Sequence, residues 1–473
     1  MSALLASVFV FAIGPAEAWR IEADRVTLIN TLNNPSATRV VFRTPFDTVP
    51  VVVSLASRAG SNSSDLRIFN VTTTGFDIVQ VEDSSWDGPH VSMNVDYIAA
   101  EPGHHAFPDG QEIIVGRFDT TAAQAGPSTG LTSTWDSVIF DTPLPGTPAV
   151  IAEIQTMNSE SANPPATSSI PWLTSVVSNA SSAGFDIAME RSEAGSGTLM
   201  SETLGYIALE AGALGNFLDT GGASINWEAR RSGAIVDGWN DGCDSVTYAT
   251  SPFGAPRVVA SKNSRTDPDG GWLRYCSLGS TSISLTVDED RAGDGERSHA
   301  GQVAATLAFD RSFHAEFAPE ISAEKSVEIV EDPINGLTDP YAIAGARVRY
   351  TVRIQNTGNG RVDPGTIAFS DAIPENLTMI VSDMAGAGSG PVQFSEPDGA
   401  TGLNYGFNSL GDSGDSLEFS CDGGASFNCV PVPGPDGTDS SVTHIRLRPT
   451  GPLKGDETGA PVTAVFEFDM LIR

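Results

Sequence analysis

The sequence has few basic residues. Its 26 Lys and Arg stand against 59 Asp and Glu, so the formal net charge is −33. A surface of this sign repels nucleic acid and anionic lipid, which argues against both as partners. The same charge favours solubility, and it can also attract divalent cations.

Long hydrophobic runs are also missing. No stretch after residue 18 is long enough to span a bilayer, so we expect no membrane insertion. The first residues, MSALLASVFVFAIGPAEA, combine a short apolar run with the small-residue pattern Ala16-Glu17-Ala18, although no Lys or Arg precedes the run. This combination predicts a signal peptide over residues 1–18 and a secreted or cell-surface protein.

Familiar catalytic motifs do not occur. The sequence holds no G-x-S-x-G, no H-E-x-x-H, no P-loop and no dinucleotide fingerprint. Carboxylates are too numerous for the sequence to single out a glycosidase pair. The adjacent His104 and His105 have no Cys or third His beside them, which does not favour a metal site. We therefore expect neither an enzyme nor a bound metal.

Cysteine is scarce, with four residues in the chain. An even number in an exported chain indicates disulfides, and four cysteines allow three pairings. Cys421 and Cys429 flank a short glycine-containing loop, and Cys243 and Cys276 fall in one predicted module. The favoured pairing is therefore Cys243 with Cys276 and Cys421 with Cys429.

Internal repetition is the most informative feature that is present. VVFRTPFDTVPVVVSLAS from Val40, SVIFDTPLPGTPAVIAEIQT from Ser137 and SVTYATSPFGAPRVVASKNS from Ser245 each read as a strand, a Pro/Gly turn and a second strand. Gly-Phe-Asp-Ile follows twice, at residues 75–78 and 184–187, and a closing strand such as VDYIAAEPG ends each unit. The spacing predicts three modules, 19–110, 111–220 and 221–316.

The predicted modules are all-β. Apolar residues alternate with polar ones, which is typical of half-buried antiparallel strands, and no helical periodicity is convincing. A change of composition begins a fourth module, 317–473, with about seven short strands and an Ig-like pattern. The sequence thus predicts tandem antiparallel β-sandwiches, three related and six-stranded and one Ig-like.

Two resemblances follow from these segments. The three repeats resemble H-type lectin domains of the discoidin and snail agglutinin type, through the F-x-x-x-P-x-V strand pair, the Gly-Phe-Asp-Ile strand and the closing Tyr-Ile-Ala strand. The fourth module resembles the conserved-repeat Ig-like domain of bacterial surface proteins, through YTVRIQNTGNGRVDPGTIAFSDAIPENL. The second resemblance implies an extracellular setting and no chemistry.

The lectin resemblance implies a sugar site in repeat 1. That family binds sugar through an Arg on a middle strand and a Trp-containing loop, which places Arg67, Trp86, Asp87 and His90 at the site. An indole covers the apolar face of a sugar ring, and charged groups bind its hydroxyls. Repeats 2 and 3 have no Trp in the corresponding loop, so the expectation concerns repeat 1.

Two acidic segments could supply oxygen ligands to calcium. They are Asp267-Pro-Asp269-Gly270 and Asp288-Glu289-Asp290 together with Asp294. Neither has the spacing of an EF-hand, and solvated turns are the favoured alternative. We therefore expect no resident cofactor, with calcium as the alternative.

The sequence leaves three classes of function. The favoured one is a secreted or cell-surface structural or adhesive protein, with self-assembly into a fibre or matrix as an open question. The alternative is a carbohydrate-binding protein that binds glycans through repeat 1. An enzyme, or an accessory to one, is the least favoured because no catalytic motif is present.

Overall fold

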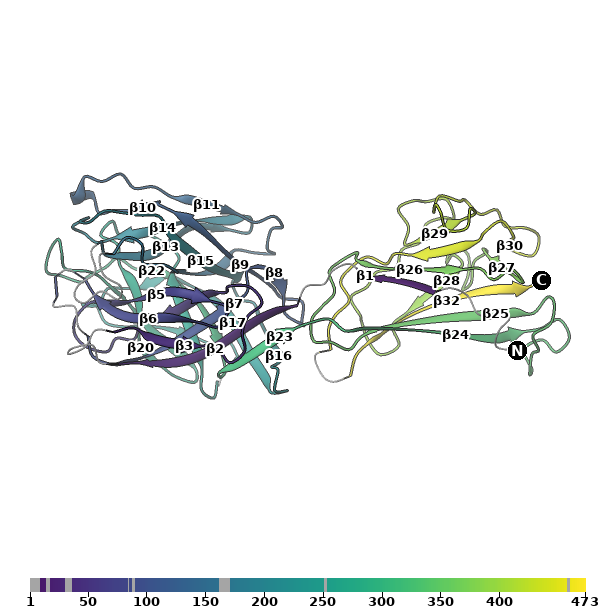
Figure 1. Ribbon diagram of the computed structural model, residues 1–473, viewed down its shortest axis with the longest axis horizontal. Helices are drawn as coiled ribbons and strands as arrows, with labels where there is room; N and C mark the ends of the chain where they lie inside the picture. The colour runs from purple at the N-terminus through teal and green to yellow at the C-terminus, as the bar shows by residue number, and fades with distance from the viewer. Residues whose placement is uncertain are drawn as a thin grey trace. The chain divides into compact units, whose positions relative to one another are not determined.

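The computed structural model describes residues 9–13, 18–29, 36–83, 85–86, 90–160, 171–250, 253–456 and 460–473. The chain forms two compact units. Trp19–Glu316 is called the repeat unit below, and Phe317–Arg473 together with Met1–Ala18 the C-terminal unit. Strands and one short 3₁₀ turn, Pro127–Thr129, make up the regular structure of the described residues (Figure 1), which confirms the predicted all-β class. No described helix could cross a membrane.

Each repeat is a sandwich of two antiparallel sheets with six strands of its own. In repeat 1 the sheets are β2 (Trp19–Leu28), β7 (Met93–Ala100) and β4 (Val51–Leu55), against β3 (Thr38–Val41), β6 (Gly75–Glu82) and β5 (Ser64–Thr72). In repeat 2 they are β9 (Glu112–Thr120), β15 (Glu202–Glu210) and β12 (Pro148–Ile154), against β11 (Asp136–Ile139), β14 (Gly184–Arg191) and β13 (Leu173–Ser181), with a short β10 (Ala123–Gln124) beside β14. In repeat 3 they are β17 (Ser224–Val236), β22 (Gln302–Phe309) and β19 (Arg257–Lys262), against β18 (Asp244–Thr247), β21 (Ser282–Asp288) and β20 (Trp272–Leu278).

The repeated Gly-Phe-Asp-Ile segment has a physical explanation. A Cβ on Gly75 would lie 2.0 Å from the carbonyl oxygen of Val40, so the close approach of β3 requires glycine. Phe76 is buried in the core of repeat 1, and Asp77 accepts a hydrogen bond from the Asn70 amide at 2.9 Å. The same contacts recur in repeat 2, around Gly184. The motif is therefore set by packing and turn geometry.

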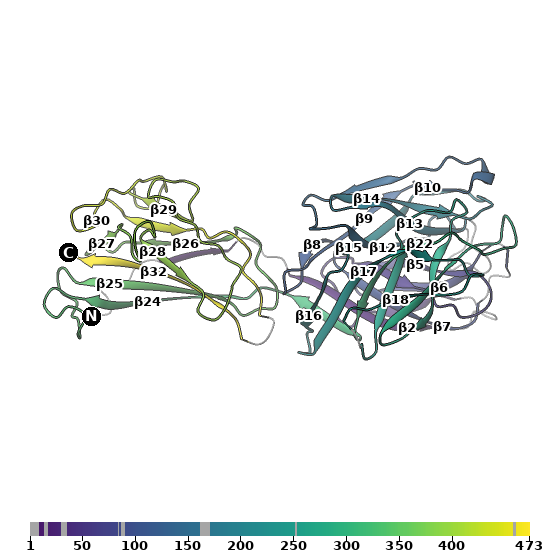
Figure 2. The ribbon, with the colours of Figure 1, turned by 180° about the vertical axis from the view of Figure 1, so that it is seen from behind.

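The strands that link the repeats pair across the predicted module boundaries. β8 (Gly103–Ala106) falls in the sequence of repeat 1 but pairs with β9 of repeat 2. β16 (Leu214–Leu218) likewise precedes repeat 3 and pairs with β17 (Figure 2). β23 (Phe313–Phe317), at the end of repeat 3, pairs with β2 at the start of repeat 1. The repeat unit is therefore closed on itself.

In each repeat, the sheet that contains the closing strand has one buried edge. β4, β12 and β19 occupy these edges, and nearly all their residues are buried. Buried main-chain N–H and C=O groups need partners, and side chains of the neighbouring repeat supply them. The side-chain amide of Gln155 in repeat 2 bonds the N–H and C=O of Val52, and that of Asn263 in repeat 3 does the same for Val150. The carboxylate of Asp96 in repeat 1 accepts from the N–H of Val258. Repeat 2 thus completes an edge of repeat 1, repeat 3 one of repeat 2, and repeat 1 one of repeat 3, so the three contacts form a closed cycle.

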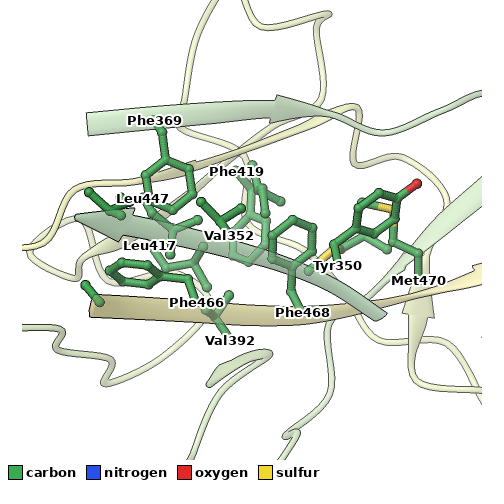
Figure 3. Close-up of a cluster of buried hydrophobic side chains, with 14 of the residues drawn as sticks. Tyr350, Val352, Phe369, Val392, Leu417, Phe419, Leu447, Phe466, Phe468 and Met470 are labelled. Atoms are coloured by element: carbon green, nitrogen blue, oxygen red, sulfur yellow. The ribbon is translucent and has the colours of Figure 1, made fainter. Parts of the chain in front are cut away.

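The C-terminal unit is a second sandwich. One sheet contains β24 (Ile321–Glu331), β25 (Arg347–Asn356), β32 (Thr463–Ile472), β27 (Leu377–Ile380) and β30 (Thr438–Asp439), and β28 (Val392–Ser395) also pairs with β32. The other contains β26 (Ile367–Ala372), β31 (His444–Leu447) and β29 (Leu417–Ser420). Alternate residues of β25 and β32, such as Tyr350, Val352 and Phe466, meet Phe369 and Phe419 of the other sheet in one core (Figure 3).

The predicted signal peptide contributes a strand to the C-terminal unit. β1 (Phe9–Ile13) pairs with β26 in antiparallel register, and the two strands lie side by side in Figure 1. The rest of the predicted signal peptide, apart from Ala18, lies outside the described residues. The export signal itself stays a prediction.

Both disulfides have the pairing favoured from the sequence. Cys243 is bonded to Cys276, and Cys421 to Cys429. The first joins the segment before β18 to β20. Arg58 of repeat 1 lies beside it, with Nη1 2.9 Å from the Cys243 sulfur. This disulfide therefore lies where repeats 1 and 3 meet.

Replacing each cysteine pair by serine should lower the free energy of unfolding by different amounts. The cysteines are 33 and 8 residues apart. Loop-closure entropy then gives about 3–4 kcal/mol for the Cys243–Cys276 pair and about 1 kcal/mol less for the other. Urea denaturation of the two double variants measures the difference. Free thiols in the unreduced protein, detected by mass spectrometry, would contradict the pairing.

Asn263→Ala should lower stability by about 1–3 kcal/mol, because it leaves the buried N–H and C=O of Val150 without their partner. Asn216→Ala is the matched control, since Asn216 is exposed on β16 and should change stability by less than about 0.5 kcal/mol. Urea denaturation compares the two. Equal effects would show that the side-chain amide does not support the edge of β12.

Candidate functional site

The Arg predicted to bind sugar lies in the interior of the repeat unit. The Arg67 side chain is 3% exposed, and its Nε donates to Glu160 of repeat 2 at 2.5 Å. Its guanidinium carbon lies 4.7 Å from the ring centre of Trp172, also in repeat 2. Arg67 therefore joins repeats 1 and 2 and does not face solvent. Its partners come from another repeat, which the sequence of repeat 1 alone does not reveal.

His90 is buried as well. Its Nε2 lies 3.1 Å from the Ser64 hydroxyl, and its Nδ1 lies 3.0 Å from the carbonyl oxygen of Val91. Burial lowers the pKa of His90 to about 4, so the ring is neutral at neutral pH. The Ser64–His90 contact lacks the arrangement of a catalytic triad, because Nδ1 faces a main-chain carbonyl and not a carboxylate.

Trp86 is the predicted sugar-binding residue that keeps some exposed surface. Its indole Nε1 donates to the Ser63 hydroxyl at 2.8 Å. The guanidinium of Arg291, from repeat 3, lies 5.1 Å from the indole ring centre. Asp87 lies outside the described residues. The structure thus does not bring Arg67, Trp86 and His90 together at an exposed surface.

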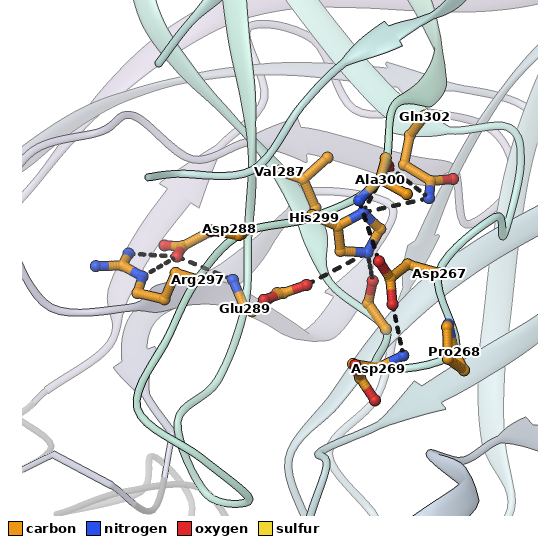
Figure 4. A network of polar contacts seen from close by, with 12 residues as sticks. Asp267, Pro268, Asp269, Val287, Asp288, Glu289, Arg297, His299, Ala300 and Gln302 are labelled. Carbon is orange, nitrogen blue, oxygen red and sulfur yellow. Dashed lines mark hydrogen bonds and ion pairs between the residues drawn. The ribbon is translucent and has the colours of Figure 1, made fainter. Parts of the chain in front are cut away.

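The two acidic segments considered for calcium do converge. Asp267 and Glu289 lie with His299 in one cluster, in which one ligand atom of each residue lies within 4.8 Å of the other two (Figure 4). Asp267 follows β19, Glu289 follows β21, and His299 precedes β22. The contribution of His299 was missed from the sequence. A comparison of the repeats could have found it, because His299 precedes the closing strand of repeat 3 as His90 precedes that of repeat 1.

Asp288 and Asp290 have other partners. Asp288 accepts hydrogen bonds from Arg274, at 2.6 Å, and from Arg297 at 2.7 Å. Asp290 accepts from the backbone N–H of Glu193 in repeat 2, at 3.0 Å. Asp288 is therefore neutralised, whereas Asp290 is held by main-chain dipoles.

Glu193 extends this acidic region across the junction of repeats 2 and 3. Its carboxylate accepts from the backbone N–H groups of Gly293 and Asp294, at 2.9 and 3.2 Å. Burial raises the pKa of Glu193 to about 8, and the charge of Asp290 adds to the rise. Burial likewise raises the pKa of Asp290 to about 7.

A buried ion pair lies beside the cluster. The Lys262 ammonium is fully buried, donates to Glu190 of repeat 2 at 2.6 Å and donates to the Gly270 carbonyl at 2.8 Å. Arg265 donates to the other Glu190 oxygen, also at 2.6 Å. Burial lowers the pKa of Lys262. One carboxylate therefore faces two cations here, which leaves a net positive charge next to the acidic cluster.

Hollows in the two units differ in character. A cavity of about 40 Å³ between the repeats is lined by Asp65, Arg67, Glu153 and Lys262, and it has room for roughly three waters. A groove of about 260 Å³ in the C-terminal unit is lined mainly by apolar side chains, among them Phe394 and Tyr405. The first is too small for a sugar ring, and no ionisable pair lines the second.

Comparison with known proteins gives limited similarity. No family model matches the chain. The chain is 26% identical over 325 residues to Halomucin of Haloquadratum walsbyi, a match that covers 66% of this chain and 3% of Halomucin. The matched segment is thus a small part of a far longer protein.

A comparison of structures adds no fold relationship. A chain from a structure described as the triple jelly roll fold and turret assembly in an archaeal virus aligns with 89% of this chain and 91% of its own length. The identity is 10% and the TM-score 0.09, so the two folds do not superpose.

Glu193→Gln should change how stability depends on pH. A carboxyl group whose pKa rises on folding keeps its proton in the folded state while the unfolded chain releases it, so stability is lost as pH rises from about 4.5 to about 8. The variant should therefore gain at least about 1 kcal/mol relative to wild type between pH 5 and pH 8, one pKa unit being worth about 1.4 kcal/mol. Urea denaturation at both pH values measures the gain.

Glu296→Gln is the control for this prediction, because Glu296 is an exposed carboxylate of the same region. It should shift stability by less than about 0.5 kcal/mol at either pH. A wild-type stability that rises from pH 5 to pH 8, with Glu193→Gln parallel to it, would show that Glu193 is ionised in the folded protein.

Proposed function

We propose that this protein is an exported structural protein whose folded units act as a stable scaffold or spacer outside the cell. The closed cycle of the three repeats is the observation that carries the proposal. Side chains of each repeat complete the buried sheet edge of another, and β23 returns from the end of repeat 3 to β2. Such closure stabilises the repeat unit, because the buried edges find their hydrogen-bond partners inside it.

Disulfides and sequence similarity support an extracellular setting. Both cysteine pairs are oxidised, and disulfides persist in oxidising compartments. The similarity to Halomucin covers 3% of that protein. Modules of this kind therefore occur as small parts of a very long chain, which fits a building element better than a self-contained enzyme.

The charge of the chain fits the same role. A net charge of −33 keeps copies soluble and disfavours nucleic acid and anionic lipid as partners. The proposal includes no catalytic activity. Self-assembly and adhesion are more specific versions of this proposal, and both apply to the protein displayed on the cell surface.

The lectin alternative has less support. It assigns sugar binding to Arg67, yet the Arg67 side chain is buried and bound to Glu160. His90 is also buried, against Ser64. The exposed part of Trp86 remains as the feature on which sugar binding could rest.

Antibody against the chain should label intact producing cells or detect the protein in the medium, with both disulfides formed. Non-reducing mass spectrometry of the recovered protein checks the disulfides. In parallel, a glycan array probed with multivalently displayed wild type and Trp86→Ala should show no specific binding by either.

Two outcomes would contradict the proposal in different ways. Protein confined to the cytoplasm with free thiols would exclude an extracellular role. Glycan binding by wild type that Trp86→Ala abolishes would establish the lectin function in place of the structural one.

A further inference from the structure

One buried carboxylate in the repeat unit lacks hydrogen-bond partners. Glu289 is 1% exposed, and among the described residues neither of its carboxylate oxygens has a hydrogen bond. Its nearest polar partner is His299, with Oε1 3.5 Å from Nε2, which is too long for a hydrogen bond. Leaving a carboxylate buried in this way is costly, so the site requires a proton or a cation.

The imidazole of His299 is oriented as metal-bound imidazoles are. Its Nδ1 lies 2.8 Å from the carbonyl oxygen of Ala300, which accepts a proton carried by Nδ1 and leaves Nε2 free to bind a metal. Nε2 faces Glu289 (Figure 4) and also lies at hydrogen-bond distance from the Gly270 carbonyl oxygen. A neutral imidazole carries one proton, so with that proton on Nδ1 the lone pair of Nε2 is available to a metal ion.

Asp267 supplies the third ligand atom. Its two oxygens accept from the backbone N–H groups of Ala300 at 3.0 Å and Asp269 at 3.2 Å, which hold the carboxylate against the cluster. The 3.5 Å between Glu289 and His299 equals about one edge of a tetrahedron with 2.0–2.2 Å bonds to zinc.

The equivalent place in repeat 1 shows what a filled site without a metal looks like. There Glu82 accepts a hydrogen bond from the Asn62 amide at 3.0 Å, and His90 contacts the Ser64 hydroxyl. Repeat 3 has a glycine, Gly271, at the position of Ser64, and its Glu289 lacks an amide partner. The two repeats thus share the His and the Glu, and differ in the hydrogen-bond partners of these two residues.

We infer that Asp267, Glu289 and His299 form a binding site for a divalent transition-metal ion of the zinc class. One imidazole nitrogen with two carboxylates suits Zn²⁺ or Mn²⁺ better than Ca²⁺, which prefers six to eight oxygen ligands. The ion supplies the positive charge that Glu289 lacks. It ties the segment after β19 to the loop between β21 and β22, which stabilises this end of repeat 3.

The neighbouring charges favour a cation at this site. Asp269 and Glu296 add negative charge on the solvent side of the cluster. Lys262 and Arg265 share the Glu190 carboxylate, at 2.6 Å each, which leaves one positive charge against the several carboxylates of the cluster and its surroundings. A divalent ion beside Asp267 and Glu289 would therefore be attracted and not repelled.

Isothermal titration of the chelator-treated full chain with Zn²⁺ at pH 7.5 should show one specific site. Glu289→Gln and His299→Gln should each weaken binding by at least the 10–100-fold that loss of an outer partner of a ligand costs. Zn²⁺ should raise the melting temperature of wild type, because it binds the folded state alone, and should not raise that of either variant. Circular dichroism checks that both variants fold.

Two matched controls separate this site from surface carboxylates and surface imidazoles. Glu324→Gln makes the same change at an exposed carboxylate of the C-terminal unit, and His104→Gln makes it at an exposed imidazole outside the cluster. Both should bind Zn²⁺ as wild type does. Zinc-edge X-ray absorption of the wild-type complex should show imidazole and oxygen scattering without sulfur, which tests the ligands even where a variant fails to fold.

Several outcomes would overturn the inference. They are the absence of specific Zn²⁺ binding, equal weakening by the control and site variants, and an absorption spectrum without imidazole. Calcium binding that exceeds zinc binding and survives His299→Gln would also overturn it, because the ion would then be held by oxygen alone. None of these results bears on whether the protein is extracellular and structural, so the two proposals fail separately.

Discussion

The repeat unit depends on the burial of three sheet edges. β4, β12 and β19 each end a sheet, and each is covered by another repeat, so water cannot bind their outer N–H and C=O groups. Gln155, Asn263 and Asp96 supply the missing hydrogen bonds. Because each of these side chains belongs to a different repeat, no repeat keeps its native edge alone, and the three modules behave as one folding unit.

A second constraint is the shortage of cations in an acidic chain. Three of the 26 basic residues are lysines, and two of them, Lys262 and Lys325, pair with carboxylates inside the protein, at 2.6 and 2.5 Å. Arg274 and Arg297 together neutralise Asp288. Where no cation is at hand, around Glu289 and Glu193, burial raises the pKa of the carboxyl groups to about 9 and about 8. The acidic cluster thus holds buried carboxyl groups that keep their protons to a higher pH than exposed ones do.

The sequence pointed to two of the three residues of the candidate site, Asp267 and Glu289, and not to the third. The segments around Asp267 and Glu289 stood out as acidic, but an acidic segment is normally a solvated turn, and 22 residues separate the two. His299 carried no signal of its own, because a lone His before a strand is common. Arg67 was predicted at an exposed sugar site because its own repeat does not show what buries it. It lies on a strand, β5, as the lectin resemblance implies, whereas the Glu160 and Trp172 that bury it belong to another repeat.

Local pattern was sufficient for the all-β class, the three related modules and the disulfide pairing, because strand alternation, turn residues and short cysteine spacing act between residues close in the chain. Tertiary structure alone decided that β8, β16 and β23 pair with the next repeat in the cycle, and that Asp267, Glu289 and His299 meet. The strand pairings run between modules, whereas the cluster brings together three segments of repeat 3 that are separated in the chain. Neither kind of contact leaves a periodicity in the sequence, because each joins segments that are distant in the chain.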